Sequence, residues 1–500
     1  MAEKSVEMGS LILPDGTPHS IRFIRDSETG TYILQAGHPM TGADGKPMAI
    51  PGVSIENTSL RDINITTAVS KVDGENGKLS YRGYDIQDLV THTSYEEVSS
   101  LLLHGELPNE NQLSVFKSRL AEKAVLSTKV QKQLAGVLKA IEIDKDTNPM
   151  ELMTTLMGVM GSQEQLPIKG EAARYDSSLR TMAVMPTLIG LVNARLQAGN
   201  NPGKMDNYVF PKKEDFGENG EKFSYAELLL SALQQKPIAD LDAKQVEAID
   251  KYLILHAEHG LNLSTLTARV VDSGEAKAGA WRISVGAGQS LAGDRHGNAS
   301  NEALNNLKSI LARPEATIEE KVNGYIAESD ENYRRSKQNP PEQQTAVGCV
   351  IPGIGHKIYE APDPRAAALQ GILASSQQRS PLLDVALCLQ DKLKDHPRFG
   401  KRTPKPYFPN VDFCSGVLLT ELGIDERLMT SMFEVSRNAG WHAQTAESAR
   451  SVGNIARPEA IVTIEDRPFI PMDARAVPTD VTEARAEQPF PQPTKLVRAA

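Results

Sequence analysis

The stretch QVEAIDKYLILHAEHGLNLSTLTARVV, residues 245–271, decides the fold. Its apolar residues recur at steps of three and four, which is the spacing that lines one face of an α-helix. The same pattern returns along most of the chain, with glycine and proline at the boundaries between segments. The further segments with this pattern are 86–108, 149–161, 177–196, 224–234, 301–311, 316–328, 364–378, 382–394 and 425–443. The sequence therefore predicts an all-α body built from many helices of ordinary length.

The two ends of the chain have a different character. Residues 10–36 alternate between apolar and polar in the manner of β-strands, with turn signals between the strands. Because the following stretch, 37–52, is rich in glycine and proline, we expect 1–52 to be a small β module and linker joined to the helical body. Residues 468–500 are rich in Pro, Ala, Asp and Arg and lack periodicity, which predicts a poorly ordered tail.

Length and composition exclude several classes of protein. The 500 residues suggest two or three domains, and 40% hydrophobic with 24% charged residues is typical of a globular protein. A net charge of −10 argues against a nucleic-acid partner, although a local basic pocket remains compatible with it. The three cysteines, Cys349, Cys388 and Cys414, form no CxxC and indicate a reducing compartment. No signal peptide and no run of about 18 apolar residues is present, so we expect a cytoplasmic protein without a membrane partner.

Residues suited to acid–base chemistry gather in the second half of the chain, beside glycine, proline and small residues. Histidine and aspartate transfer protons near neutral pH, and arginine pairs with carboxylates through two parallel hydrogen bonds. Such a set fits chemistry on a small polyanion. The candidates are His256, His259, His296, His356, Asp412, Arg365, Arg437 and Arg457.

The first two histidines lie three residues apart in HAEHGLNLST (256–265). That spacing places both on one face of a helix. Three interpretations are open: a structural pair that caps a buried helix end, a substrate contact, or a metal site. The string HAEH matches neither HExxH nor HxxEH, which disfavours the metal site.

His296 and His356 stand in glycine-containing loops. Asn298 or Ser300 can cap the helix after His296, and a helix N-terminus lowers the pKa of a nearby imidazole and keeps it neutral. A plain loop histidine is the alternative. Glycines 353 and 355 before His356 let a ligand approach the backbone closely, but the segment is not GxGxxG.

Asp412 is the one acid in the small, apolar setting of PNVDFCSG (409–416). A carboxylate in such surroundings has a raised pKa and can act as a base unless it is paired. The alternative is that Asp412 is the N-cap of a helix over 413–421.

Together these segments resemble the citrate synthase family. YRGYDIQDL (81–89) is similar to the family's YRGY-x-I-x-x-L, HAEHGLNLST to HADHE-LNAST, and GIGHKIYEAPDPR (353–365) to GFGHRVYK-x-x-DPR. NVDFCSG is similar to NVDFYSG, and SRNAGW and IARPE to the family's ART-VGW and ARP. The resemblance covers roughly residues 55–460 in the family's order.

The resemblance implies a multi-helical, citrate-synthase-like body with a large domain over 53–296 and 412–467 and a small domain over 297–411. It implies an acyltransferase of the tricarboxylic acid cycle that condenses acetyl-CoA with oxaloacetate. Asp412 would take a methyl proton from acetyl-CoA, His296 would stabilise the enol, and His356 would polarise the ketone. The substrate's carboxylates would be held by His259, Arg365, Arg437 and Arg457, with His256 in support.

The resemblance also implies partners. Acetyl-CoA is expected as a co-substrate, with no tightly bound cofactor and no metal. A homodimer or dimer-based hexamer is expected, with Arg457 reaching the partner's site, and the N-terminal β module resembles in type that of the longer bacterial enzymes. The backbone expected to face the CoA adenine comprises Val350, Ile351, Pro352, Gly353, Ile354 and Gly355.

Two segments depart from the family pattern. Where the family has PLHGGANE, this chain has DRHGNASNE (294–302), with one residue added, and Glu360 stands at a position that is often basic. An added residue can displace His296, and Glu360 would repel a CoA phosphate. A 2-methylcitrate synthase that uses propionyl-CoA and a non-catalytic carboxylate- or CoA-binding paralogue are therefore the alternatives.

Overall fold

The predicted helical body is present in the structure, a computed structural model. It describes the backbone of 5–12, 18–25 and 32–34, together with 65, 67–163, 170–274, 279–293, 297, 299–338, 351–356, 358–374, 380–399 and 408–451. The expected linker over 37–52 and the expected tail over 468–500 lie outside these ranges.

The N-terminal strands form a three-stranded antiparallel sheet in the order β1-β2-β3. The strands are β1 (Ser5–Ile12), β2 (Pro18–Arg25) and β3 (Tyr32–Leu34). Long runs of alternating residues pair in register here, with Ser5 opposite Arg25. The predicted β strands at this end of the chain are confirmed.

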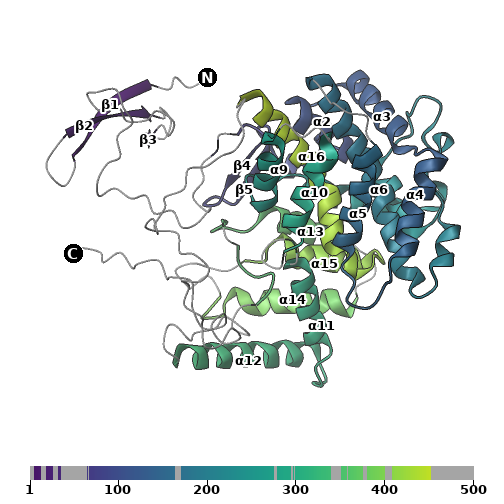
Figure 1. Ribbon diagram of the computed structural model, residues 1–500. Helices are drawn as coiled ribbons and strands as arrows, with labels where there is room; N and C mark the ends of the chain where they lie inside the picture. Colours follow the sequence, from purple (N-terminus) through teal and green to yellow (C-terminus); the bar gives the residue numbers. More distant parts are fainter. Residues whose placement is uncertain are drawn as a thin grey trace, which may run out of the picture. The chain divides into compact units, whose positions relative to one another are not determined.

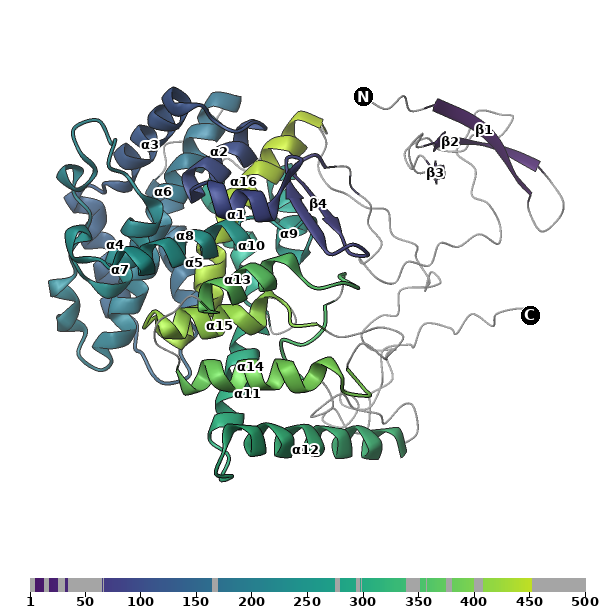
Figure 2. The same cartoon turned by 180° about the vertical axis from the view of Figure 1, so that it is seen from behind.

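A second small sheet was not expected from the sequence. Its strands are β4 (Ser70–Asp73), β5 (Lys78–Tyr81) and β6 (Tyr84–Asp85), in antiparallel order β4-β5-β6. Strands of two to four residues are too short for an alternating pattern to stand out. The sheet leads directly into the first helix (Figure 2).

The chain forms two compact units, each assembled from separated segments. Unit 1 comprises Met1–Leu113, Glu247–Asn262 and Glu302–Glu421, and unit 2 comprises Ser114–Val246, Leu263–Asn301 and Leu422–Ala500. The large and small domains expected from the resemblance, with borders at 296, 411 and 467, stay a prediction.

Unit 1 holds the second sheet and the helices around it. Its helices are α1 (Ile86–His92), α2 (Tyr95–His104), most of α8 (Ala243–His256), most of α11 (Ala299–Leu311), α12 (Ile318–Gln338), α13 (Pro364–Ala374), α14 (Pro381–Lys394) and α15 (Val411–Glu421). Helix α13 packs on α15, and α14 runs beside α12 (Figures 1 and 2). Local signals set the ends: Ser94 and Glu97 form a capping box on α2, which Gly105 ends in the left-handed conformation.

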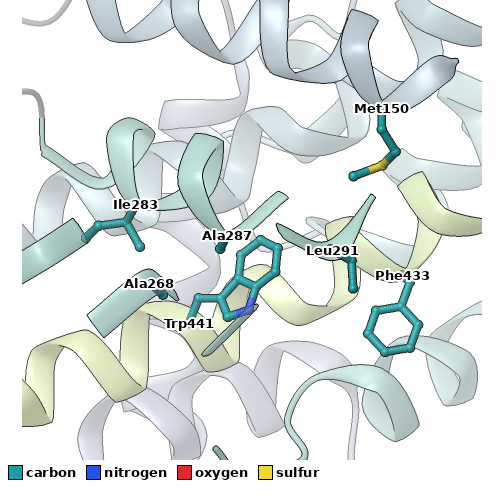
Figure 3. Close-up of a cluster of buried hydrophobic side chains, with 7 residues drawn as sticks. All are labelled: Met150, Ala268, Ile283, Ala287, Leu291, Phe433 and Trp441. Carbon is teal, nitrogen blue, oxygen red and sulfur yellow. The ribbon is translucent and has the colours of Figure 1, made fainter. Parts of the chain in front are cut away.

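Unit 2 is a bundle around α10 (Gly279–Leu291) and α16 (Met429–Ser451). Its other helices are most of α3 (Glu110–Ala124), α4 (Thr128–Ala140), α5 (Pro149–Gln163), α6 (Glu171–Ala198), α7 (Tyr225–Gln234) and α9 (Leu263–Ser273). In the core, the indole of Trp441 lies close to Ala268 of α9 and Ala287 of α10 (Figure 3). Small residues at these positions leave room for the large ring.

These helices confirm the prediction of a multi-helical body. Among the described residues, no helix is both long enough and apolar enough to cross a membrane.

Candidate functional site

The two histidines of HAEHGLNLST do not share a helix face. Helix α8 ends at His256, so His259 lies in the turn that follows, and the expectation of one helical face is wrong. His256 is fully buried, with Nδ1 at 2.8 Å from the Tyr252 carbonyl and Nε2 at 3.0 Å from the Ser415 hydroxyl. Both of its ring nitrogens therefore have protein partners, which leaves neither for a metal ion.

Three aromatic rings in unit 1 form one cluster: His259, His356 and Tyr359. The Nε2 atom of His259 lies 3.1 Å from the Tyr359 hydroxyl. The ring centroids of His259 and His356 are 5.5 Å apart, and those of His356 and Tyr359 are 4.6 Å apart. The end of α8 and the loop before α13, about 100 residues apart in sequence, thus meet here.

Backbone hydrogen bonds determine which ring nitrogen of neutral His356 carries the proton. Its Nδ1 accepts hydrogen bonds from the backbone N–H groups of Ile358 and Tyr359, each at 3.0 Å. The neutral ring therefore carries its proton on Nε2, which becomes a donor. Burial, reinforced by the nearby Arg365 guanidinium, lowers the pKa of His356 to about 4. The ring is consequently a neutral hydrogen-bond donor at physiological pH.

Arg365 is buried and paired with a carboxylate. Its Nη2 and Nε lie 2.8 and 3.1 Å from the two carboxylate oxygens of Asp363, and its backbone N–H donates to the same group. Burial works against both charges, yet their mutual attraction holds the pKa of Asp363 below and that of Arg365 above the usual value. Among the described residues, Nη1 of Arg365 has no hydrogen-bond partner, so it is a candidate donor to an anion.

The loop before His356 runs antiparallel to the segment before Asp412. Ile354 and Pro409 form a β-bridge, the Gly355 N–H donates to Phe408, and the Asn410 N–H donates to Gly353. At Gly353 the backbone φ is +80°, and a Cβ would lie 2.9 Å from Phe413, so only glycine fits. On the side of Gly353 where a Cβ would point, the side chains of Phe413 and Ala303 occupy the space.

Asp412 lies in the first turn of α15, which begins at Val411. The alternative that Asp412 is an N-cap is therefore wrong, because Asn410 accepts the hydrogen bond from the Phe413 N–H. The Val411 N–H donates to Asp363 at 3.2 Å, which ties this helix start to the Asp363–Arg365 pair. Asp412 is half-buried, and the start of the helix that carries it is anchored on Asp363.

The other predicted residues fall in unit 2 or outside the described ranges. Arg437 is buried in α16 with its guanidinium 4.5 Å from the centre of the Phe433 ring. His296, Arg457 and Val350 lie outside the described residues. Gly297, next to His296, donates its N–H to Leu291 and accepts from the Thr430 hydroxyl, so the backbone beside His296 is fixed within unit 2.

Two residues of this site were missed from the sequence: Tyr359 and Asp363. Asp363 could have been found from the sequence, because an acid two residues before an arginine at the start of a helix can form an ion pair with it. Here Pro364 is the first residue of that helix. Tyr359 could not have been found in this way, since its contact with His259 spans 100 residues.

The described part of the site combines a neutral imidazole donor, a buried guanidinium and a half-buried carboxylate. Such a set can polarise a carbonyl, hold a carboxylate and take a proton. Among the described residues, no group of three or more His, Cys, Asp or Glu side chains is placed to hold a metal ion.

Comparisons with known proteins give one consistent result. The family described as "Citrate synthase, C-terminal domain" matches residues 60–459. Citrate synthase 2 of Bacillus subtilis is 31% identical over 423 residues, which cover 82% of this chain and 96% of that protein. Citrate synthase of Corynebacterium glutamicum is 28% identical over 458 residues, which cover 90% of each protein.

Solved structures of citrate synthases have the same fold. The enzyme from Pyrobaculum aerophilum matches with a TM-score of 0.66 and 25% identity, covering 83% of this chain and 94% of that one. The enzyme from Thermoplasma acidophilum, solved as a ternary complex with carboxymethyl coenzyme A and oxaloacetate, matches with a TM-score of 0.65 and 22% identity. That match covers 83% of this chain and 98% of the other.

Proposed function

We propose that this chain, which belongs to the citrate synthase family, condenses acetyl-CoA with oxaloacetate and hydrolyses the thioester to give citrate and CoA. The observation that carries the proposal is the state of His356: half-buried, neutral, with its proton on Nε2, beside the Asp363–Arg365 pair. A neutral donor next to a guanidinium suits a ketone flanked by carboxylates.

The first step is removal of a proton from the methyl group of acetyl-CoA. Asp412 takes this proton, and His296 donates a hydrogen bond to the thioester oxygen, where negative charge develops. Helix α15 holds Asp412 in its first turn, so the carboxylate approaches the methyl group from a rigid element. The product is an enol-like nucleophile at the methyl carbon.

The second step forms the carbon–carbon bond. The methyl carbon attacks the ketone carbon of oxaloacetate, and the electrons of the C=O π bond move onto the ketone oxygen. That oxygen takes the proton from Nε2 of His356 and becomes a hydroxyl, and the proton held by Asp412 later returns through water to His356. Water then adds to the thioester carbonyl and expels CoA as a thiol, which releases citrate and drives the reaction forward.

Carboxylate binding is assigned to His259, Arg365, Arg437 and Arg457. Support for Arg365 is its burial and its fixed orientation on Asp363, which leaves Nη1 for the substrate. His256 acts in support, since its contact with Ser415 links the end of α8 to α15. The backbone from Val350 to Gly355 is assigned to the CoA adenine, and no tightly bound cofactor is required.

We also propose that two copies of the chain assemble. Leu263 and Val270 lie two turns apart on α9 and are 52% and 48% exposed in the single chain, and a second copy would cover them. A Val270→Lys variant should shift the sedimentation coefficient to that of a monomer, and an unchanged value would exclude this face.

The small number of cysteines supports a cytoplasmic location.

The experiment that tests the function measures the initial rate of free CoA release. Purified protein receives oxaloacetate with either acetyl-CoA or propionyl-CoA, beside an Asp412→Asn variant. Asp391→Asn is the matched control, because its side chain is 74% exposed in unit 1. We expect release that depends on oxaloacetate, is fastest with acetyl-CoA, and is lost only in the Asp412 variant.

Two outcomes would redirect the proposal. Faster release from propionyl-CoA would identify a 2-methylcitrate synthase, since one methylene changes pocket fit by only about 1–3 kcal/mol. No release from either thioester, with oxaloacetate still raising the melting temperature, would identify a non-catalytic binding protein.

A further inference from the structure

The turn between β4 and β5 lies directly against the loop that carries His356. The Glu360 N–H donates to the Gly74 carbonyl at 2.8 Å. A Cβ on Gly74 would overlap the backbone carbonyl oxygen of Ile358, two residues after His356. At the other side of the turn, a Cβ on Gly77 would lie 2.7 Å from the Pro362 carbonyl oxygen. Because neither glycine has a side chain, the backbone of the β4–β5 turn lies directly against the backbone of the loop at Ile358 and at Pro362.

The same hairpin also holds the segment that carries His259. The Ser70 hydroxyl, at the start of β4, donates to the Glu258 carboxylate at 3.0 Å and accepts from the Gly260 N–H at 3.1 Å. The Tyr81 hydroxyl, at the end of β5, contacts the backbone carbonyl of Glu258 at 2.9 Å. Residues on both sides of His259 are thus bound to the hairpin.

The hairpin is itself rigid. Asn76 donates its backbone and side-chain N–H groups to Asp73 at 2.9–3.1 Å, which closes the turn. The guanidinium of Arg82 donates to the Leu102 carbonyl through Nε and Nη2, which fastens the base of the hairpin to α2. Because its turn is closed and its base is fixed to α2, the hairpin can hold the loop around His356 in place relative to the segment around His259.

We propose that the β4–β5 hairpin positions the two histidine-bearing segments relative to each other, with Gly74 and Ser70 as its positioning residues. Gly74 sets the place of the loop around His356, and Ser70 sets the place of the turn around His259. The inference rests on the proposed function for its effect on catalysis, but the geometry can be tested without activity.

The first experiment compares Gly74→Ala with Gly371→Ala. Gly371 lies exposed in α13 of the same unit, and a Cβ there meets nothing within 4 Å. The φ angle of Gly74 is not in the left-handed region, so alanine introduces only the overlap with Ile358. A displacement of about 1 Å at reacting groups can cost about 10²-fold in rate. We therefore expect kcat/KM for oxaloacetate to fall 10- to 100-fold in Gly74→Ala, with a change in KM as well as kcat, and to stay unchanged in the control.

Hydrogen exchange followed by mass spectrometry provides a readout that does not need turnover. The backbone amides of residues 358–361 and of Asp363 should exchange faster in Gly74→Ala than in the wild type, while amides of α14 should be unaffected. The Gly371→Ala protein should match the wild type at both places.

A second pair of variants covers the case in which Gly74→Ala fails to fold. Ser70→Ala removes the hydroxyl that joins Glu258 to Gly260, and Ser70→Thr restores one. We expect a rise in KM for oxaloacetate of about 5- to 20-fold in Ser70→Ala, as loss of hydrogen bonds to a charged group implies, and recovery in Ser70→Thr.

The possible results separate the two proposals. No CoA release from the wild type would refute the proposed function, while faster exchange at 358–363 in Gly74→Ala would still support positioning by the hairpin. Wild-type exchange and kinetics in both Gly74→Ala and Ser70→Ala would overturn the positioning role.

Discussion

The Tyr359 hydroxyl lies 3.1 Å from Nε2 of His259, and both side chains are buried. Tyr359 also stands 4.6 Å from His356, centre to centre, and donates its backbone N–H to Nδ1 of that ring. One residue therefore contacts both His259 and His356. It orients His259 through its side chain and sets the tautomer of His356 through its backbone.

Replacing Tyr359 by phenylalanine should separate these two roles. The variant keeps the ring and the backbone N–H but loses the bond to His259, and a hydrogen bond contributes about 0.5–1.5 kcal/mol. We expect KM for oxaloacetate to rise about 3- to 10-fold with kcat within a factor of about two, measured as initial CoA release. Tyr84→Phe, at a 37% exposed tyrosine, is the control. A large loss of kcat with unchanged KM would contradict this division.

His356 should remain neutral over the physiological pH range. Burial and Arg365 lower its pKa to about 4, so the ring loses its proton above that pH and keeps Nε2–H as a donor. The ring nitrogens of His356 should show no titration between pH 5.5 and 8 in nitrogen NMR spectra. His356→Gln should lower kcat/KM about 10²-fold, whereas His92→Gln, at an exposed histidine, should not. A titration near pH 6.5 assigned to His356 would refute the tautomer argument.

Asp363→Asn should destabilise the protein by about 3–5 kcal/mol, because the buried Arg365 guanidinium would keep its charge and lose its counterion. The pKa of Asp363 is lowered in the folded protein, so its stabilising effect is present above the unfolded value of 3.8 and is lost as pH falls below it. Urea unfolding at pH 7 and at decreasing pH measures both effects. Asp395→Asn, at an exposed position, should unfold like the wild type. Equal stability of the Asp363 variant and the wild type at pH 7 would show that the pair is not held together in solution.

Glu434→Gln should make the stability of unit 2 less sensitive to a rise in pH between 4.5 and 8. Glu434 is fully buried in α16 and neither carboxylate oxygen has a hydrogen-bond partner among the described residues. Burial raises its pKa from 4.5 to about 8, so the folded state holds a proton that the unfolded state releases. Stability should therefore fall as pH rises from 4.5 to 8, by up to about 1.4 kcal/mol per pH unit.

The glutamine variant should lose this part of the pH dependence, as measured by thermal unfolding across that range. Glu142→Gln, on the exposed surface of unit 2, should keep the wild-type profile. An unchanged slope in Glu434→Gln would mean that this carboxyl is ionised in the folded protein.

Much of the fold was predictable because it depends on local patterns. The steps of three and four in 245–271 and the capping signals around Ser94 and Gly105 act over a few residues, so helices could be placed from the sequence. The sheet of β4–β6 could not, because its strands are two to four residues long and exist through pairing. The order of motifs also led to the citrate synthase family, which the family match over 60–459 confirms.

The sequence by itself determined which side chains are available: imidazoles at 259 and 356, a guanidinium at 365 and a carboxylate at 412. Tertiary structure decided what each can do. His356 became a neutral donor only because two backbone N–H groups and partial burial act on its ring, and Arg365 became oriented because Asp363, also buried, pairs with it. The charge state and the orientation of each side chain depend on solvent exclusion and on its partners. Some of these partners are distant in sequence, as Tyr359 is from His259, 100 residues away. Those quantities exist only once the chain has folded.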